Sequence, residues 1–169
     1  MPKKFLAIIL ITKLFSRLIL KITGKFHNIY YEKYKGMNFI ENKKSGIFED
    51  QKRISFLYEN IVYVIWKKDV VVDYEDAESA IKYTLEQFGR DGKKFPTLVE
   101  MSEISALTKE ARSYFQKENP KTSSALALVV DSILSRVLGN LFINLDKPLI
   151  PVRMFTSMEQ GSLWLKTFV

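Results

Sequence analysis

Cysteine is absent from this chain of 169 residues. The absence excludes disulfides, thiolate nucleophiles and Cys-ligated zinc or iron–sulfur centres, and it gives no sign of an oxidising compartment. Histidine is nearly absent as well, since His27 is the only one. Histidine-based acid–base catalysis, Ser-His nucleophiles and His-metal sites therefore have almost no residues to draw on.

Glycine-rich phosphate loops are also missing. Neither G-x-x-x-x-G-K-[ST] nor G-x-G-x-x-G occurs among the seven Gly residues. Together these absences predict a protein that is not an enzyme and holds no cofactor or metal. The composition, 47% hydrophobic and 27% charged, is that of a globular protein, and the length suits one domain with an attached extension.

The positive charge is confined to one end of the chain. Residues 1–36 contain eight of the 26 Lys and Arg residues and one of the 19 acids, so they carry the whole net charge of +7. The remainder is neutral and lacks the broad basic surface that contact with a phosphate backbone requires. We therefore expect no nucleic-acid partner.

The first segment has an amphipathic pattern. Its apolar run at 5–11 is interrupted by Lys13, well short of the roughly 18 uncharged residues of a spanning helix. No small-x-small cleavage site follows it, so a secretory signal is not indicated. Lys13, Arg17 and Lys21 recur at every fourth position and would form one cationic stripe on a helix. Such a helix suits peripheral contact with an anionic membrane.

A second interpretation of this segment stays open. Residues 1–36 are dominated by Lys, Ile, Phe, Tyr and Leu, which AT-rich DNA encodes even when it is not coding, and Met37 is a plausible start. The chain thus divides into residues 1–36, a lead-in at 37–51 and a domain at 52–169. We expect a cytoplasmic protein, membrane-peripheral if residues 1–36 are translated.

From residue 52 onward, strands and helices alternate. Residues 52–58 and 61–66 are β-branched and aromatic runs, and Glu59-Asn60 between them predicts a tight hairpin because Asn tolerates positive φ. The elements expected after the hairpin are a helix from Asp73 to about Gly89, a strand at 97–101, a helix from Thr108, a strand at 124–130, a helix at 133–145, a strand at 152–155 and a helix at 157–168.

Residue spacing predicts which sides of these elements face the core. The strand at 124–130 is apolar on both faces, which is typical of a central parallel strand. The side chains expected to point inward are Ala77, Ile81, Leu85 and Phe88 of the first helix, Ala111, Tyr114 and Phe115 of the second, and Leu163 and Trp164 of the last. Glu75, Asp76 and Glu78 crowd the first turn after Asp73, where the helix dipole favours acids, so we interpret them as structural.

Three stretches of the sequence carry a family resemblance. KFPTLVEMSEI at 94–104, TKEARSYF at 108–115 and SRVLGNLFINLDKPLIPVRMFTSMEQGSLWLKTF at 135–168 resemble the STAS domain, the fold of the anti-sigma-factor antagonists. Within that fold the chain is similar to small, uncharacterised bacterial single-domain proteins called STAS/SEC14-like. The resemblance covers about 37–169. It implies a mixed α/β sheet that begins with an antiparallel hairpin and continues through helix–strand units.

The resemblance also implies a function, partner switching controlled by phosphorylation, but this sequence departs from the phosphorylation motif. Classical antagonists switch partners when a Ser directly after the cap of the second helix is phosphorylated. Aligning VEMSEISALTKEA on that stretch places Thr108 at the cap and Lys109 at the acceptor position, and a lysine cannot form that phosphate ester. Ser102, Ser105 and Thr108 remain as substitute acceptors.

These considerations lead to one main hypothesis and one alternative. The main hypothesis is a non-enzymatic regulatory or protein-interaction domain with an unidentified protein partner, and homodimerisation is open. The expected interaction or anion surface consists of Ser105, Thr108, Lys109, Arg112 and Arg136. The alternative, suggested by the cationic stripe and the STAS/SEC14-like resemblance, is a lipid- or small-anion-binding protein that could be peripheral to the membrane. Ligands of open α/β sheets gather at strand carboxyl ends, where a small anion could bind.

Overall fold

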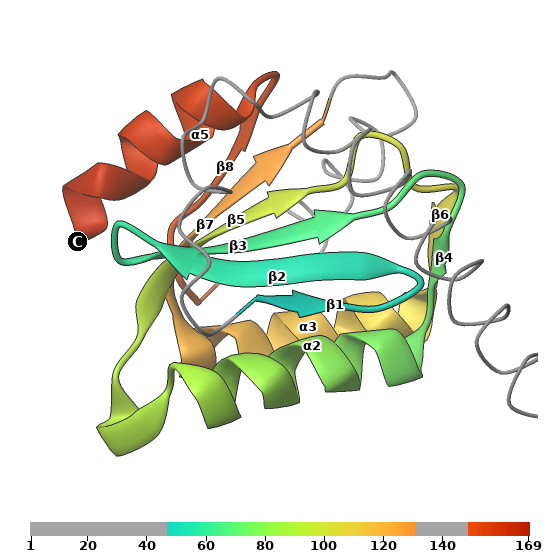
Figure 1. Ribbon diagram of the computed structural model, residues 1–169, viewed down its shortest axis with the longest axis horizontal. Helices are drawn as coiled ribbons and strands as arrows, with labels where there is room; N and C mark the ends of the chain where they lie inside the picture. The colour runs from blue at the N-terminus through green and yellow to red at the C-terminus, as the bar shows by residue number, and fades with distance from the viewer. Residues whose placement is uncertain (1–46, 131–148) are drawn as a thin grey trace, which may run out of the picture. The chain divides into compact units, whose positions relative to one another are not determined.

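The structure, a computed structural model, describes residues 47–130 and 149–169 (Figure 1). A mixed six-stranded sheet in the order β1-β2-β3-β5-β7-β8 forms its centre. Its strands are β1 (Phe48–Glu49), β2 (Arg53–Tyr58), β3 (Ile61–Trp66), β5 (Phe95–Glu100), β7 (Ser123–Val129) and β8 (Val152–Phe155). This is the mixed α/β sheet that the resemblance implies, with the hairpin first and the parallel strands after it.

The antiparallel part of the sheet comprises β1, β2 and β3. The β2–β3 hairpin turns through Glu59 and Asn60, with φ of 47° and 60°, as the Asn at this position predicted. Strand β1 lies within the expected lead-in at 37–51 and was not predicted. A two-residue strand is too short to show a period, and only its pairing with β2 reveals it.

The parallel part begins where β3 pairs with β5. Strand β7 lies between β5 and β8 and pairs in parallel with both, so the prediction of a central parallel strand is confirmed. The helix expected at 133–145, which contains Arg136, lies outside the described residues. The same holds for residues 1–36.

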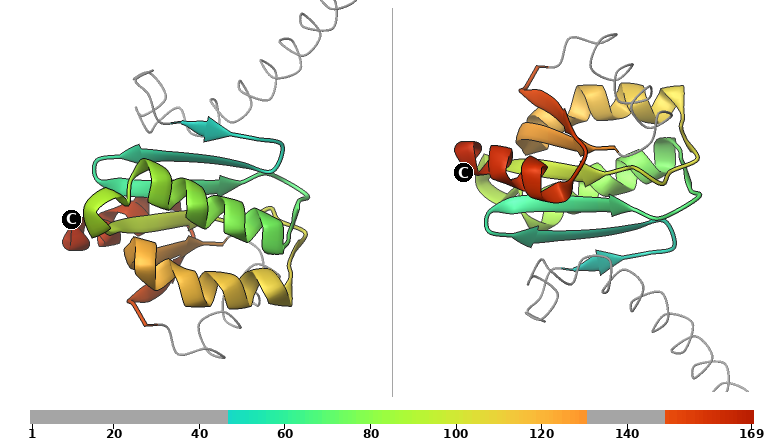
Figure 2. Two further views of the ribbon diagram at one scale, coloured as in Figure 1. Left: turned by 90° about the horizontal axis from the view of Figure 1, so that it is seen from below. Right: turned by 90° about the horizontal axis from the view of Figure 1, so that it is seen from above.

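Helices cover both faces of the sheet (Figures 1 and 2). Helices α2 (Tyr74–Gln87) and α3 (Lys109–Thr122) lie side by side on one face, and α5 (Met158–Leu165) lies on the other. Short 3-10 turns, η1 (Arg90–Gly92) and η2 (Lys166–Phe168), follow α2 and α5. In the described part of the chain, no helix is long and apolar enough to cross a membrane.

The main apolar core fills the space between the sheet and the α2–α3 layer. Its buried members are Val62, Val64, Trp66, Val72, Ala77, Ala80, Phe95, Met101, Ile104, Ala111, Leu126, Leu128 and Val130. The opposite face of the sheet packs on α5, where the buried Tyr63 and Ser162 hydroxyls are 3.0 Å apart. Burial raises the pKa of Tyr63, so this phenol stays neutral and hydrogen-bonded.

Two predicted helix faces were partly wrong. Leu163 is 72% exposed and Trp164 is half-buried, whereas Leu165 is fully buried. The reason is Gly161, where an added Cβ would stand 3.1 Å from a Leu98 methyl carbon, so the α5 backbone itself lies close to the sheet and small residues occupy the inner face. Leu85 of α2 is also exposed, at 39%. Hydrophobicity alone therefore misplaced these side chains.

A second, small parallel sheet joins the connections that lead into α2 and α3. It pairs β4 (Val71–Val72) with β6 (Ala106–Leu107) and was not predicted. Its ladder continues on either side, since Ser105 N–H donates to Val70 C=O at 2.8 Å and Thr108 N–H donates to Val72 C=O at 3.0 Å. The two helices consequently begin at a shared, hydrogen-bonded edge.

Candidate functional site

The start of α3 brings four predicted site residues together: Ser105, Thr108, Lys109 and Arg112. Thr108 caps the helix in extended backbone geometry, with φ of −65° and ψ of 159°, and its Oγ1 accepts a hydrogen bond from Ala111 N–H at 3.2 Å. We call these four residues the α3-start surface. Arg136, Lys13, Arg17 and Lys21 lie outside the described residues.

The two cations of the α3-start surface are available to an incoming group. Lys109 is exposed and Arg112 is half-buried. Within residues 47–130 and 149–169, no hydrogen bond or ion pair engages either side chain. The first turn of a helix already carries positive potential from its free N–H groups, so these cations add to a local attraction for carboxylates or phosphates.

Apolar side chains from neighbouring elements extend this surface. Val71 of β4 is 46% exposed and pairs across the small sheet with Ala106. Tyr74, in the first turn of α2, is 41% exposed and packs edge-to-face on Tyr114 of α3, with ring centroids 5.1 Å apart. Exposed apolar groups beside unengaged cations are typical of a protein-binding surface.

The three substitute phosphorylation sites differ in access. Ser102 is 8% exposed, and its hydroxyl and backbone N–H both contact the buried Glu100 carboxylate. Thr108 is half-buried and its hydroxyl serves as the helix cap. Ser105 alone of the three is exposed.

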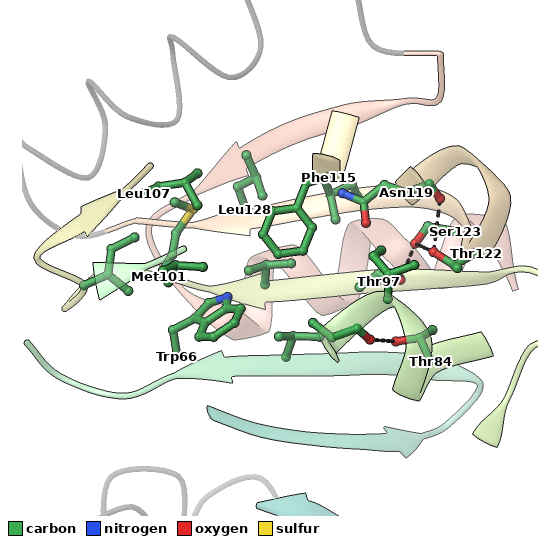
Figure 3. Close-up of a pocket in the computed structure, with 17 residues that line it drawn as sticks. Trp66, Thr84, Thr97, Met101, Leu107, Phe115, Asn119, Thr122, Ser123 and Leu128 are labelled. Atoms are coloured by element: carbon green, nitrogen blue, oxygen red, sulfur yellow. Dashed lines mark hydrogen bonds between the residues drawn. The ribbon is translucent and has the colours of Figure 1, made fainter. Parts of the chain in front are cut away.

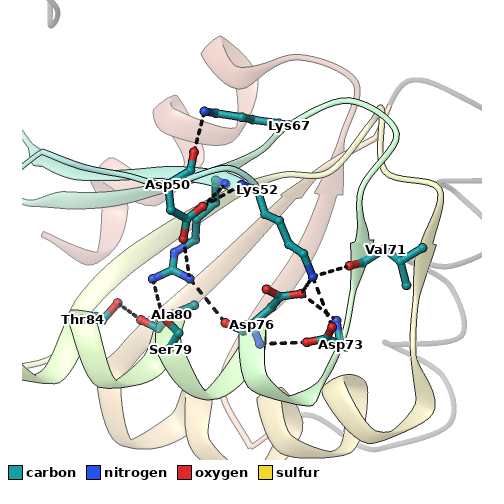
Figure 4. A network of polar contacts seen from close by, with 10 residues as sticks. Asp50, Lys52, Lys67, Val71, Asp73, Asp76, Ser79, Ala80 and Thr84 are labelled. Carbon is teal, nitrogen blue, oxygen red and sulfur yellow. Dashed lines mark hydrogen bonds and ion pairs between the residues drawn. The ribbon is translucent and has the colours of Figure 1, made fainter. Parts of the chain in front are cut away.

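The start of α2 is organised differently (Figure 4). Asp73 and Asp76 form a reciprocal capping box, and Lys52 from the start of the β2 segment reaches across it. The Lys52 Nζ lies 2.5 Å from Asp76 Oδ2 and 3.2 Å from both Asp73 Oδ2 and the Val71 carbonyl oxygen. Asp73 and Asp76 are thus bound by the domain itself, and for Asp76 this agrees with its structural interpretation.

The capping box changes the pKa values of its members. The backbone N–H of Asp76 donates to Asp73, and this hydrogen bond, aided by Lys52, lowers the pKa of Asp73 to about 2. The hydrogen bond to Asp76 raises the pKa of Lys52 above its usual value. Both groups are thus charged over the whole physiological range.

Arg53 is a buried cation that the sequence analysis did not single out. Its side chain is 1% exposed, with the guanidinium carbon 4.4 Å from the Phe48 ring centroid. One of its nitrogens donates to Ser79 Oγ at 3.1 Å and another lies 3.7 Å from Asp50 Oδ2. Burial lowers the pKa of Arg53. The local sequence gave no signal, because Arg53 shares its face of β2 with the polar Ser55. Its pairing with Trp66 of β3 places it on the core side.

A cavity of about 50 Å³ lies between the sheet and the α2–α3 layer (Figure 3). Most of its lining is apolar, and hydroxyls gather at one end. The lining residues are Val64, Trp66, Val72, Ala80, Ile81, Thr84, Thr97, Val99, Met101, Ile104, Leu107, Phe115, Asn119, Thr122, Ser123, Leu126 and Leu128. Nothing in the local sequence pattern indicated it.

In the described residues, no cluster of three or more His, Asp or Glu side chains could hold a metal ion.

Comparison with known proteins assigns no activity to this chain. No curated protein matches this chain. A solved structure of an uncharacterized protein from the DUF3478 family of Shewanella loihica PV-4, described as having a SpoIIAA-like fold, is similar at 17% identity, covering 71% of this chain and 90% of that chain with a TM-score of 0.45. A family profile matches residues 55–169, and the chain belongs to that family, the domain of unknown function DUF7793.

Proposed function

We propose that this STAS-like domain is a non-enzymatic interaction module that binds a protein partner through the α3-start surface. One observation carries the proposal. Lys109 and Arg112 stand in the first turn of α3 with no ion-pair partner in the described part of the chain, while the cation at the start of α2, Lys52, is fully engaged. Unengaged charge at a capped, rigid helix start favours recognition over a structural role.

The surface favours an acidic partner segment with an apolar anchor. Lys109 and Arg112 attract carboxylates, and the exposed Val71 and Tyr74 offer apolar area. Glu110 is exposed beside Lys109, so the surface is not uniformly basic. This mixture supports a specific protein contact and gives no support to a nucleic-acid partner.

Ser105 supplies a means of regulation within the same proposal. It is exposed and lies three residues before the Thr108 cap. A phosphate there would add nearly two negative charges next to the cations and would compete with an acidic partner. Phosphorylation at Ser105 would therefore release the partner, even though Lys109 occupies the acceptor position of the classical antagonists.

Reversing the two charges tests the proposal. Tagged wild-type protein and a Lys109→Glu/Arg112→Glu variant are used to purify partners from the native cells. The expected result is a stoichiometric partner with wild type, its loss in the variant, and an unchanged melting temperature. Lys93→Glu/Lys94→Glu is the matched control, because both lysines are exposed at the opposite end of β5 and the charge change is the same. Equal recovery with all three proteins would remove the α3-start surface from consideration.

The first segment carries a separate proposal, peripheral membrane contact through Lys13, Arg17 and Lys21. It rests on the spacing of these cations, which recur at every fourth residue and would share one face of a helix. Co-sedimentation of the full chain with phosphatidylglycerol vesicles tests it, and the Lys13→Glu/Arg17→Glu/Lys21→Glu variant should stay in the supernatant.

Two further measurements address the start of the chain and its oligomeric state. Intact-mass measurement of the native protein decides between starts at Met1 and Met37, and light scattering decides whether the chain forms a homodimer.

The alternative function, binding of a lipid or small anion, has one observation in its favour, the cavity beneath α2 and α3. The lining of this cavity argues against an anion, and its volume argues against a lipid. No charged side chain is among its lining residues, so an anion would be buried without a counter-charge. A volume of about 50 Å³ is also too small for a long acyl chain, since ligand pockets typically measure about 300–1,000 Å³.

A further inference from the structure

The cavity interrupts the core at the middle of the sheet. Val99 lies on the central strand β5, with Val64 on one side and Leu128 on the other in register. Such a position is normally fully buried because protein interiors are close-packed. Val99 is nevertheless only half-buried, and it lines the cavity. The domain therefore leaves accessible space where packing should be tightest.

The hydroxyls at one end of the cavity are already satisfied. Thr97 Oγ1 and Ser123 Oγ are 2.8 Å apart and share a hydrogen bond, and Thr84 Oγ1 donates to the Ala80 carbonyl oxygen at 2.9 Å. These hydroxyls therefore do not require a hydrogen bond from a bound molecule. Apart from the Asn119 amide and the Trp66 indole N–H, the rest of the lining is apolar, and none of it is charged. An occupant must therefore be uncharged and mainly apolar.

Trp66 supplies one unused polar group. Its side chain is 96% buried, at 4% exposure, yet its indole N–H has no hydrogen-bond partner among the described residues. In Figure 3 the nitrogen of the Trp66 indole lies on the edge of the ring that faces Phe115. An indole N–H is a donor only. In the described residues the fully buried side-chain atoms without a partner are Arg53 Nε, Ser55 Oγ and Ser124 Oγ, and the Trp66 nitrogen is not among them. An occupant with a hydrogen-bond acceptor would satisfy it.

The volume limits the size of the occupant. At roughly 10–15 Å³ for each water-sized position, about 50 Å³ gives room for three to five non-hydrogen atoms. We propose that this cavity is a binding site for a compact, uncharged small molecule with a short alkyl body and one acceptor oxygen, which accepts a hydrogen bond from Trp66. Lys109 and Arg112 are not among the lining residues of this site. The proposal of a small-molecule site is therefore independent of the proposal of a protein partner.

Two probes of different polarity test the site by NMR on the full, isotope-labelled chain. Xenon fills apolar space without hydrogen bonding, and 2-butanone adds one acceptor. Both should shift the methyl signals of Val99 and Leu128 in a saturable manner. Only 2-butanone should move the Trp66 indole N–H signal downfield, with the Trp164 indole as the internal reference. Shifts that do not saturate, or that are equal at both indoles, would overturn the proposal.

Filling the cavity gives a second measurement. Val99→Leu adds one methylene group to the lining, so the melting temperature should rise by a few degrees and the saturable xenon and 2-butanone shifts should disappear. Val62→Leu is the matched control: it makes the same change on the neighbouring strand β3, at a fully buried position that does not line the cavity. Overpacking there should lower the melting temperature.

The two variants together leave no ambiguous result. If Val99→Leu destabilises the domain as much as Val62→Leu, the space over Val99 is not available and the site does not exist. If Val99→Leu fails to fold, the wild-type titrations decide alone. Trp66→Phe should keep the xenon response and should weaken 2-butanone binding severalfold, and an unchanged 2-butanone affinity would remove the role of the indole N–H.

Discussion

Helices α2 and α3 begin side by side on the small β4–β6 sheet, yet their first turns are organised in opposite ways. The start of α2 is closed by the domain, because Asp73, Asp76 and Lys52 satisfy one another. The start of α3 is capped by one hydroxyl and leaves Lys109 and Arg112 without ion pairs in the described residues. Charge near one helix start thus serves the fold, and charge near the other is available for binding.

The comparison teaches how to separate structure from function among charged residues of similar appearance in the sequence. Lys52 directly precedes strand β2, and Lys109 is the first residue of helix α3. From the sequence alone, both lysines would be expected to be exposed to solvent. Their partners distinguish them. A lysine that joins two caps should affect stability when it is changed, whereas a lysine without a partner should affect binding only.

The largest loss of stability is expected for a change at Arg53, the buried cation that contacts α2 through Ser79. Arg53→Ala removes a fully buried side chain that packs on Phe48 and hydrogen-bonds Ser79. It should lower the free energy of unfolding by about 2–5 kcal/mol, as other large-to-small changes in cores do. Urea denaturation measures this. Lys82→Ala, on the exposed face of α2, should stay within about 0.5 kcal/mol, and a similar small effect of Arg53→Ala would show that Arg53 is not a core residue.

The next effect compares the two caps directly. Asp73→Ala removes the cap, the capping box and one contact of Lys52, so it should cost about 2 kcal/mol. Thr108→Ala removes a single accepting hydroxyl and should cost about 1 kcal/mol. Thermal and urea unfolding of the two variants give the difference. A larger loss in Thr108→Ala would reverse the contrast between the two helix starts.

A pH titration sharpens the same contrast. The pKa of Asp73 is about 2 in the folded state, below its ordinary value of 3.8. The stabilisation by this carboxylate is therefore complete above about pH 4 and is lost as the pH falls toward 2. Urea unfolding between pH 6 and pH 2 should show wild type and Asp73→Asn converging as the pH falls. Parallel curves would mean that Asp73 is not held in the capping box.

The smallest effect is expected at the start of α3. Lys109→Ala and Arg112→Ala should each leave the free energy of unfolding within about 0.5 kcal/mol of wild type, because neither side chain has an ion-pair partner in the part of the chain that the structure describes. Urea denaturation is again the measurement. A loss above 1 kcal/mol in either variant would place that residue with Lys52 among the structural cations.

Short-range signals in the sequence were sufficient for much of the fold. Glu59-Asn60 indicated the hairpin, Asp73 and Thr108 indicated the two helix starts, and the doubly apolar run that became β7 indicated a central parallel strand. Each signal depends on residues a few positions apart. The α3-start surface could be predicted for the same reason, because its four residues lie within two turns of one another.

Tertiary structure alone decided the features that depend on distant segments. The pairing of two-residue strands, the burial of Arg53 and the exposure of Leu163 each result from contacts between elements far apart in the chain. The cavity has the same origin, since its lining comes from five strands, two helices and the segments between them. A sequence specifies local geometry through hydrogen bonds and periodicity, but packing between elements determines which side chains reach water and where space remains.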